Sequence, residues 1–230
     1  MTLKSASPFF HAEYILGRVI RDKDVRLSEI YSRTLRYPIC DQQVIQCIPC
    51  LVKRLGFSLD GDLSLVHLPA RIFGNLRPGS CSWTVHDQPL PFIRYLWDCP
   101  DIPKLDLNHL NGYPLTKAVH AGFIPLIQFL LDHHASPKCH DCLAVKVAIR
   151  KKDLRLLKLL VERTSSGQDN KSGNVDGKRG RKKRQKLADR VPLDATALNL
   201  AIAAGADDIV SYLYEEKGVV PNMETIKRMK

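Results

Sequence analysis

Residues 111–137 read NGYPLTKAVHAGFIPLIQFLLDHHASP, and this stretch decides the fold of the chain. Pro114 is suited to the first turn of a helix because its missing N–H group would have no partner there. Gly122 supplies the backbone freedom that ends this helix, and the chain restarts as a second helix at Pro125. Apolar residues recur at spacings of three and four in both helices: Leu115, Ala118 and Val119, then Leu126, Ile127, Leu130 and Leu131. The stretch therefore predicts two short antiparallel helices.

Such a pair is apolar on more than one side, which favours a stack of similar units whose neighbours bury the remaining apolar surface. Residues 91–97 match residues 125–131 in their apolar positions about one repeat length earlier. Residues 143–161 reproduce both helices after the central unit, and residues 196–214 reproduce them again. The predicted units are a partial one at residues 80–100 and full ones at residues 108–137, 138–163 and 193–220.

The central unit resembles the ankyrin repeat. The core pattern of that family is Thr-Pro-Leu-His-x-Ala, followed by a Gly and a closing Leu-Leu pair. It is met here by YPLTKA at residues 113–118, by Gly122 and by the Leu-Leu pair at residues 130–131. The Thr and the His of the pattern are replaced in this unit, whereas Thr196 restores the Thr in the last one. The resemblance covers residues 80–220 and implies an all-α, ankyrin-type helical repeat solenoid.

The N-terminal part of the chain is expected to be a helical region that caps or extends the stack. Residues 37–57 contain Tyr-Pro and Ile-Pro steps like those of the central unit, so they form either one degenerate repeat or part of the cap. Residues 63–68 alternate weakly between apolar and polar, which is typical of a short strand. The expected division is a helical N-terminal region at residues 1–79, ankyrin-like repeats at residues 80–222, and a tail or truncated capping helix at residues 223–230.

A chain of 230 residues with 44% hydrophobic residues can bury a sizeable core. It has no apolar run of about 18 residues, so we expect no contact with a membrane. No apolar segment of signal-peptide length follows Met1. Seven cysteines, an odd number, favour reduced thiols over a disulfide framework. We therefore expect an intracellular protein, in the nucleus or the cytoplasm.

More than half of the net charge of +11 lies in an insertion at residues 164–192. Its first part is rich in Ser, Gly, Asn and Asp and cannot bury enough apolar surface to offset ordering entropy, so we expect a disordered loop. The basic tract that follows suits the acidic groove of a nuclear import receptor. The alternatives are phosphate contact with nucleic acid and a solvated charge run without a dedicated partner. The tract comprises Lys178, Arg179, Arg181, Lys182, Lys183, Arg184 and Lys186.

Two Cys-x-x-Cys spacings occur, at Cys47 and Cys50 and at Cys139 and Cys142. A thiolate pair at this spacing holds zinc tetrahedrally only if two more ligands converge on it. The histidines near the second pair are His109, His133, His134 and His140. Against a zinc site, no second regular pair is close in sequence, and cysteine on an apolar helix packs as a small hydrophobic residue. We expect no metal ion and no cofactor.

The sequence contains no phosphate-binding loop, no metalloprotease helix, no motif that indicates a Ser-His-Asp catalytic triad and no pair of candidate catalytic carboxylates. An enzyme is therefore not expected. The ankyrin resemblance implies instead a non-enzymatic scaffold or adaptor for protein–protein interaction. The binding face of that family implies the following partner-binding residues: His109, Gly112, His120, Ala121, Arg150, Lys151, Ala203 and Ala204. Because Arg150 and Lys151 make this face modestly basic, we expect a protein partner with an acidic segment. The alternative function is a nucleic-acid-associated regulatory factor whose basic loop contacts phosphates.

Overall fold

The structure is a computed structural model. It describes residues 7–20, 25–57, 63–79, 83–162 and 190–228. These residues are mostly helical, and each strand among them is two residues long, so the prediction of a predominantly helical chain is confirmed. No helix in the described part of the chain is long and apolar enough to cross a lipid bilayer. The chain divides into two compact units, Met1–Cys139 and His140–Lys230.

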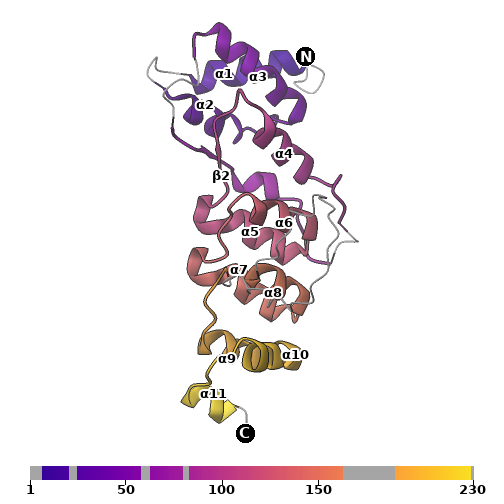
Figure 1. The fold of residues 1–230 in the computed structure, drawn as a ribbon. Coiled ribbons are helices and arrows are strands. Elements are labelled where there is room, and N and C mark those ends of the chain that lie inside the picture. The colour runs from indigo at the N-terminus through magenta and orange to yellow at the C-terminus, as the bar shows by residue number, and fades with distance from the viewer. Residues whose placement is uncertain (1–6, 21–24, 58–62, 80–82, 163–189, 229–230) are drawn as a thin grey trace, which may run out of the picture. The chain divides into compact units, whose positions relative to one another are not determined.

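Three helices begin the first unit and share an apolar core. They are α1 (Pro8–Val19), α2 (Leu27–Thr34) and α3 (Gln42–Arg54). The first of them packs against both of the others (Figure 1). Ser7 caps α1 and Asp41 caps α3, each by accepting the backbone N–H three residues further on. Each helix contributes a fully buried isoleucine: Ile15, Ile30 and Ile45.

The span of residues 37–57 holds one helix, α3, where its two prolines predict a pair. Pro38 lies in a turn before α3, whereas Pro49 lies inside the helix and removes one of its backbone hydrogen bonds. The apolar residues around it on the same face are buried: Val44, Ile45, Ile48, Leu51 and Val52. Their burial offsets the cost of the lost bond, so the helix continues through Pro49. Of the two alternatives for this span, a degenerate repeat would need a second helix, and the structure has one helix there.

Two short strands join distant parts of the first unit. β1 (Val66–His67) pairs in parallel with β2 (Leu105–Asp106), so that Val66 lies opposite Leu105 and His67 opposite Asp106. The weak strand predicted at residues 63–68 is thus present over two residues. A 3-10 turn, η2 (Ala70–Phe73), follows β1. The strand pairing brings His67 next to Asp106.

α4 (Leu90–Asp98) confirms the helix predicted from residues 91–97. The described residues just before it, 83–89, form turns and contain no helix. Trp83 packs its ring on Phe123, with the ring centroids 4.9 Å apart, and its Nε1 donates a hydrogen bond to the Ala121 carbonyl at 3.2 Å. The indole therefore covers the end of a later helix instead of belonging to a helix of its own.

The two helices predicted from the opening stretch are present as α5 (His109–Ala121) and α6 (Ile124–Asp132), and they pack against each other. Leu110, Asn111 and Gly112 have left-handed backbone angles, so the right-handed part of α5 begins after Gly112. A Cβ atom at Gly112 would lie 2.5 Å from the Cβ of Cys139. Only glycine fits there.

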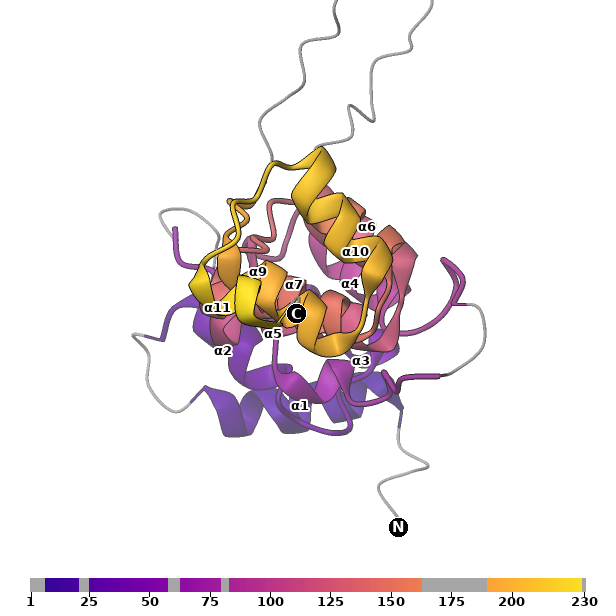
Figure 2. The same cartoon turned by 90° about the horizontal axis from the view of Figure 1, so that it is seen from below.

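The described residues of the second unit form helices joined by turns and irregular segments. Its elements are α7 (Cys139–Arg150), α8 (Leu154–Val161), α9 (Ala195–Ala204), α10 (Asp207–Ser211), a π-helical turn η3 (Tyr212–Glu216) and α11 (Met223–Arg228). α9 packs against both α10 and α11, and Figure 2 shows α11 beside α9. The buried Thr225 of α11 donates from Oγ1 to Oδ1 of Asn199 in α9 at 2.6 Å. The chain from residue 223 to 228 is thus a helix held by its neighbour.

One turn geometry recurs between the helices of three pairs. After α5, α7 and α9, a residue with left-handed backbone angles is followed by a backbone N–H that donates to the carbonyl five residues earlier. These bonds run from Phe123 to Ala118 at 3.0 Å, from Asp153 to Ala148 at 3.2 Å and from Ala206 to Ala201 at 3.1 Å. The left-handed residues are Gly122, Lys152 and Gly205.

Candidate functional site

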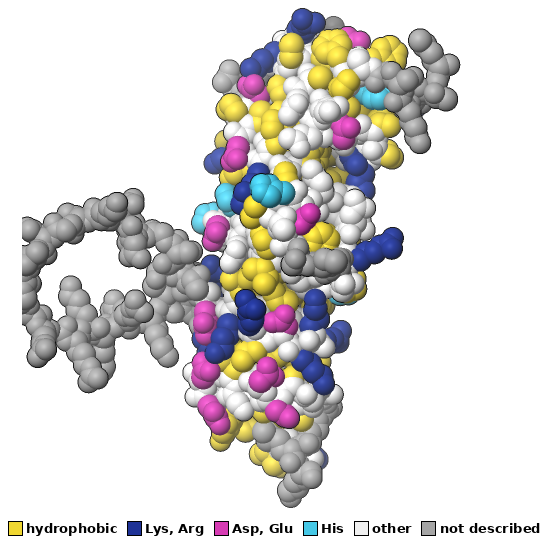
Figure 3. Space-filling view, turned by 90° about the vertical axis from the view of Figure 1, so that its right-hand side faces the viewer, with side chains coloured by type: hydrophobic (Ala, Val, Ile, Leu, Met, Phe, Trp, Pro, Cys, Tyr) yellow, Lys and Arg dark blue, Asp and Glu magenta, His cyan; other side chains and the backbone are white. Residues whose placement is uncertain are grey.

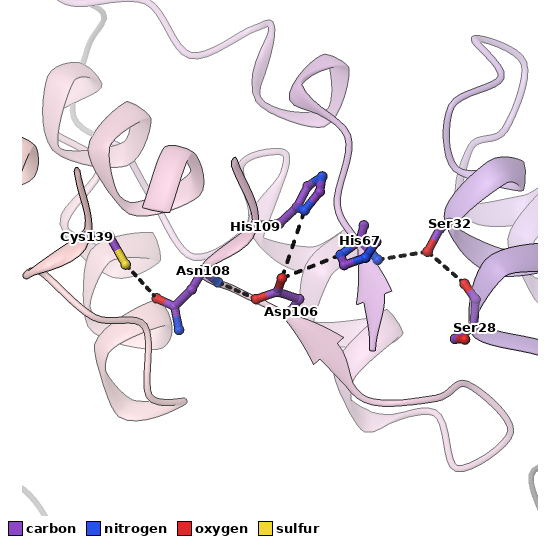
Figure 4. Close-up of polar contacts among 7 residues, drawn as sticks. All are labelled: Ser28, Ser32, His67, Asp106, Asn108, His109 and Cys139. Carbon is purple, nitrogen blue, oxygen red and sulfur yellow. Dashed lines mark hydrogen bonds and ion pairs between the residues drawn. The ribbon is translucent and has the colours of Figure 1, made fainter. Parts of the chain in front are cut away.

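Two histidines and one aspartate come together where β1 and β2 meet in the first unit. The parallel pairing sets His67 opposite Asp106, and His109 follows Asp106 by three residues at the start of α5. His67 Nδ1 lies 3.4 Å from Asp106 Oδ2, and His109 Nδ1 lies 3.9 Å from the same oxygen. The two imidazole rings stack with centroids 4.2 Å apart and planes 24° apart. Figure 4 shows both rings directed at one carboxylate.

The carboxylate is oriented by its own turn. Asp106 Oδ1 accepts the Asn108 N–H at 2.9 Å, which leaves Oδ2 facing the two imidazoles (Figure 4). Asn108 is held in turn, because its Oδ1 accepts the Ser136 N–H at 2.7 Å and the Cys139 thiol at 3.6 Å. Its side chain therefore ties the turn at residue 106 to the chain after α6.

His67 is held through its backbone. Its N–H donates to Ser32 Oγ at 2.9 Å, and the Ser32 hydroxyl donates to the Ser28 carbonyl at 2.7 Å. Both serines belong to α2 and are buried. The His67 side chain keeps 46% of its surface exposed, compared with 24% for His109 and 22% for Asp106. The cluster is thus anchored on its inner side and open to solvent at His67.

The surroundings of His109 favour its neutral form. Partial burial is the main cause that lowers the pKa of His109, and the neighbouring His67 and Arg36 lower it further, while Asp106 acts in the opposite direction. A neutral imidazole has a free lone pair on one ring nitrogen, which is the form that binds metal ions. The residue is therefore suited to act as a ligand at neutral pH.

The arrangement has the chemistry of a metal-binding group. One ligand atom each from His67, Asp106 and His109 lies within 4.8 Å of the other two. Within the described residues, no other group of three possible metal ligands comes together in this way. Histidine nitrogen and carboxylate oxygen are ligands for zinc and other first-row transition metals. Figure 3 shows histidine side chains gathered beside both basic and acidic ones on one face of the molecule.

The cysteines singled out from the sequence lie elsewhere. Cys139 is half-buried against Asn108, and neither it nor Cys142 belongs to a converging group of ligands in the part of the chain that the structure describes. Cys47 is partly exposed and directs its thiol to the Gln43 carbonyl, 3.5 Å away. Cys50 is exposed on α3, so it does not pack as a small hydrophobic residue.

Sequence reasoning named one member of the cluster, His109, and missed the other two. The Asp106-x-x-His109 spacing is a local signal that places both side chains near one turn. His67 carries no such signal, because only the pairing of β1 with β2 brings it there.

The residues predicted to bind a partner do not all reach the surface. Gly112 is buried against Cys139, and Ala121 is buried beneath Trp83, so neither can contact a partner, and their assignment to a binding face is wrong. His109 is partly exposed, and Ala204 likewise. The predicted residues that are exposed are His120, Arg150, Lys151 and Ala203.

Four of the exposed cations among the described residues of the second unit lie at the turn between α7 and α8: Arg150, Lys151, Lys152 and Arg155. Lys227, on α11, is exposed as well. Other lysines of the unit are matched by acids, since Lys146 pairs with Asp141 and Lys158 with Glu216. Figure 3 shows such mixed charges on the visible face of this unit. The predicted basic tract, from Lys178 to Lys186, lies outside the described residues.

Comparisons with protein-family models, with curated proteins and with solved structures give no match for this chain.

Proposed function

We propose that this chain is a non-enzymatic, ankyrin-type repeat scaffold that binds a protein partner. The observation that carries the proposal is the turn shared by three helix pairs, in which an N–H bonds to the carbonyl of Ala118, Ala148 or Ala201. In each case a small residue near the end of the first helix precedes a left-handed residue, although the surrounding sequences differ. The same turn also follows α3 and α6 and is a common way to end a helix, so its place between the two helices of each pair is what supports a repeated structural unit.

A second recurring feature supports the same proposal. Residues 110–112 and residues 140–142 each form three consecutive left-handed residues at the start of a first helix, one repeat length apart. Leu-Asn-Gly in one case and His-Asp-Cys in the other are alike in their middle residue, because Asn and Asp both tolerate left-handed angles, and differ in the flanking ones. Left-handed angles are unfavourable for most residues, so their recurrence indicates a constraint imposed by the unit and not by the side chains.

The exposed cations after α7 favour an acidic segment as the bound partner. Arg150, Lys152 and Arg155 form no ion pair with any described residue, so they are available to carboxylates of another chain. Complementary charge of this kind increases the association rate and orients the partner. Their position at a turn between two helices matches the place where repeat scaffolds present contacts.

Binding to a defined acidic peptide tests the proposal. The purified chain is titrated into a fluorescent peptide rich in Asp and Glu, with a peptide of the same length in Asn and Gln as the control. In every variant the seven Lys and Arg of the basic tract are changed to Gln, because that tract would also attract the peptide. Fluorescence anisotropy gives the affinity.

Reversing two charges, Arg150→Glu with Lys152→Glu, should weaken binding to the acidic peptide about tenfold at low salt, since each exposed pair is worth roughly 0.5–1 kcal/mol. The matched control is Lys104→Glu, an exposed lysine of the first unit. Equal binding of both peptides, or the same affinity in the Arg150 and Lys152 variant as in the parent, would contradict the proposal.

Nuclear import through the basic tract belongs to the same proposal. A fluorescently tagged chain should accumulate in the nucleus, and changing Lys182, Lys183 and Arg184 to Ala should redistribute it. Retention on DNA or RNA that decreases with salt and disappears when residues 171–186 are deleted would favour the nucleic-acid-associated alternative.

A further inference from the structure

We propose that His67, Asp106 and His109 bind one Zn²⁺ ion at the junction of β1 and β2. The protein would supply two imidazole nitrogens and one carboxylate oxygen, and water would complete the coordination. This site is separate from the cations after α7 and has no part in the proposed binding of an acidic segment.

The distances in the cluster are close to those that a tetrahedral zinc site needs. Zinc bonds to nitrogen and to carboxylate oxygen are about 2.0–2.2 Å long, so ligand atoms around one ion are about 3.3 Å apart. Asp106 Oδ2 lies 3.4 Å from His67 Nδ1 and 3.9 Å from His109 Nδ1. The ligand atoms of the three side chains lie within 4.8 Å of one another, and the two imidazole rings are stacked, so seating the ion requires the histidine side chains to rotate until one nitrogen of each ring faces it.

The neighbouring hydrogen bonds prepare the carboxylate for this role. Asn108 N–H occupies Asp106 Oδ1, which leaves Oδ2 for the ion. Asn108 is itself fixed by the Ser136 N–H, and the backbone of His67 is fixed by Ser32. Such outer contacts hold metal ligands in place and contribute to metal affinity. The Asp106 carboxylate and the backbone of His67 are thus positioned before any ion arrives.

Charge sets the strength of the site. Asp106 is the anion of the cluster, and His67 borders a groove of about 490 Å³ lined by three arginines, Arg26, Arg33 and Arg36, and one acid, Glu29. The arginines oppose a cation, although Arg33 is engaged with Glu29. With three protein ligands and this surrounding charge, we expect weaker binding than in a structural site closed by four protein ligands. The open coordination position and the half-exposed His67 give the ion a path from solvent.

Zinc binding would stabilise the first unit. His67 and the turn at residues 106–109 lie far apart in sequence, and they are joined in the fold by two strands of two residues each. An ion that holds both segments stabilises the folded state to the extent that it binds this state more tightly than the cysteines and histidines of the unfolded chain. The melting temperature should therefore rise with the Zn²⁺ concentration.

Metal titration of the full chain tests this inference. The protein carries no histidine tag and is purified with a chelator, which is then removed, in a reductant that does not bind metal. Calorimetry with Zn²⁺ should give one ion per chain. Co²⁺ in its place should give the visible absorption of a tetrahedral site without the near-ultraviolet band of a thiolate ligand, since no cysteine takes part.

Three variants assign the ligands. His67→Gln and His109→Gln each remove one nitrogen ligand, and Asp106→Asn removes the anionic ligand while keeping an oxygen that accepts the Asn108 N–H. Each should weaken Zn²⁺ binding by at least about tenfold, because even outer-shell losses cost that much. The matched control is His86→Gln, which changes an exposed histidine in a turn and should leave the affinity unchanged.

Circular dichroism confirms that each variant is folded, and Asp106→Asn is the variant whose hydrogen bond to the turn is retained. Parent affinity in both Asp106→Asn and His109→Gln would overturn the inference. A thiolate-to-cobalt band would also overturn it and would point to Cys139 or Cys142 instead. If the parent chain does not bind Zn²⁺, the inference of a zinc site is also overturned. The proposal that the chain binds an acidic peptide does not depend on this result.

Discussion

Replacing Gly112 with Ala should destabilise the first unit by about 2–5 kcal/mol, and the structure shows where this free energy comes from. Gly112 has a φ of 78°, and a left-handed conformation costs an L-residue roughly 1–2 kcal/mol. The new Cβ would also lie 2.5 Å from the Cβ of Cys139. Relieving such an overlap requires a backbone shift, which typically costs about 1–3 kcal/mol.

Gly56→Ala is the matched control. Gly56 has a φ of 84°, close to that of Gly112, but nothing lies within 4 Å of the position its Cβ would take. This variant should therefore lose only the backbone part, about 1–2 kcal/mol. The difference between the two variants measures the contact with Cys139.

Urea unfolding followed by tryptophan fluorescence measures both losses. The chain has two tryptophans, Trp83 and Trp97, and both belong to the first unit, so the signal reports on that unit. In the double variant Gly112→Ala with Cys139→Gly, the close contact disappears, and the cost of Gly112→Ala should fall to that of Gly56→Ala. The reasoning is refuted if Gly112→Ala and Gly56→Ala lose the same stability.

Three further outcomes are expected. Asp194→Ala should cost about 0.5–2 kcal/mol, because Asp194 caps α9 by accepting the Thr196 hydroxyl and backbone N–H groups. These hydrogen bonds, the Thr196 hydroxyl first, lower the pKa of Asp194. The stabilisation by the Asp194 carboxylate is therefore fully present above its unfolded-state pKa and is lost as the pH falls through its folded-state pKa. Hydrogen exchange of the α9 amides should show this loss, and Asp194→Asn should remove the pH dependence. Phe123→Ala should cost about 3–5 kcal/mol in urea unfolding, since the ring is fully buried; a loss below about 1 kcal/mol would contradict its place in the core. Burial raises the pKa of Cys40 to about 12, so iodoacetamide at neutral pH should modify the exposed Cys50 and spare Cys40 until the protein unfolds, as peptide mass spectrometry can show.

The helices around the opening stretch follow from short-range rules. Gly122 ends α5 in a left-handed conformation, and Pro125 lies in the first turn of α6, as their residue types predict. α4 is likewise present where its apolar spacing predicts it. Each of these signals acts within a few residues, so the sequence alone is enough to find them.

Where sequence reasoning failed, a distant segment decides the outcome. α3 runs through Pro49 because its apolar face is buried against α1, and the gain from that burial is not visible in the local sequence. The ankyrin resemblance implies that Gly112 and Ala121 lie on an exposed binding face. In this chain Gly112 is covered by Cys139, and Ala121 is buried next to Trp83. Burial depends on which segments pack together, and this depends on the whole unit.

The candidate metal site combines both kinds of information. Asp106 and His109 are three residues apart, so local backbone geometry alone sets both side chains near one turn, although the sequence analysis named only His109. Only the tertiary structure added His67, through the pairing of β1 with β2. Hydrogen bonds between strands join residues that are far apart in the chain, and for that reason the third ligand was decided by the fold and not by any local spacing.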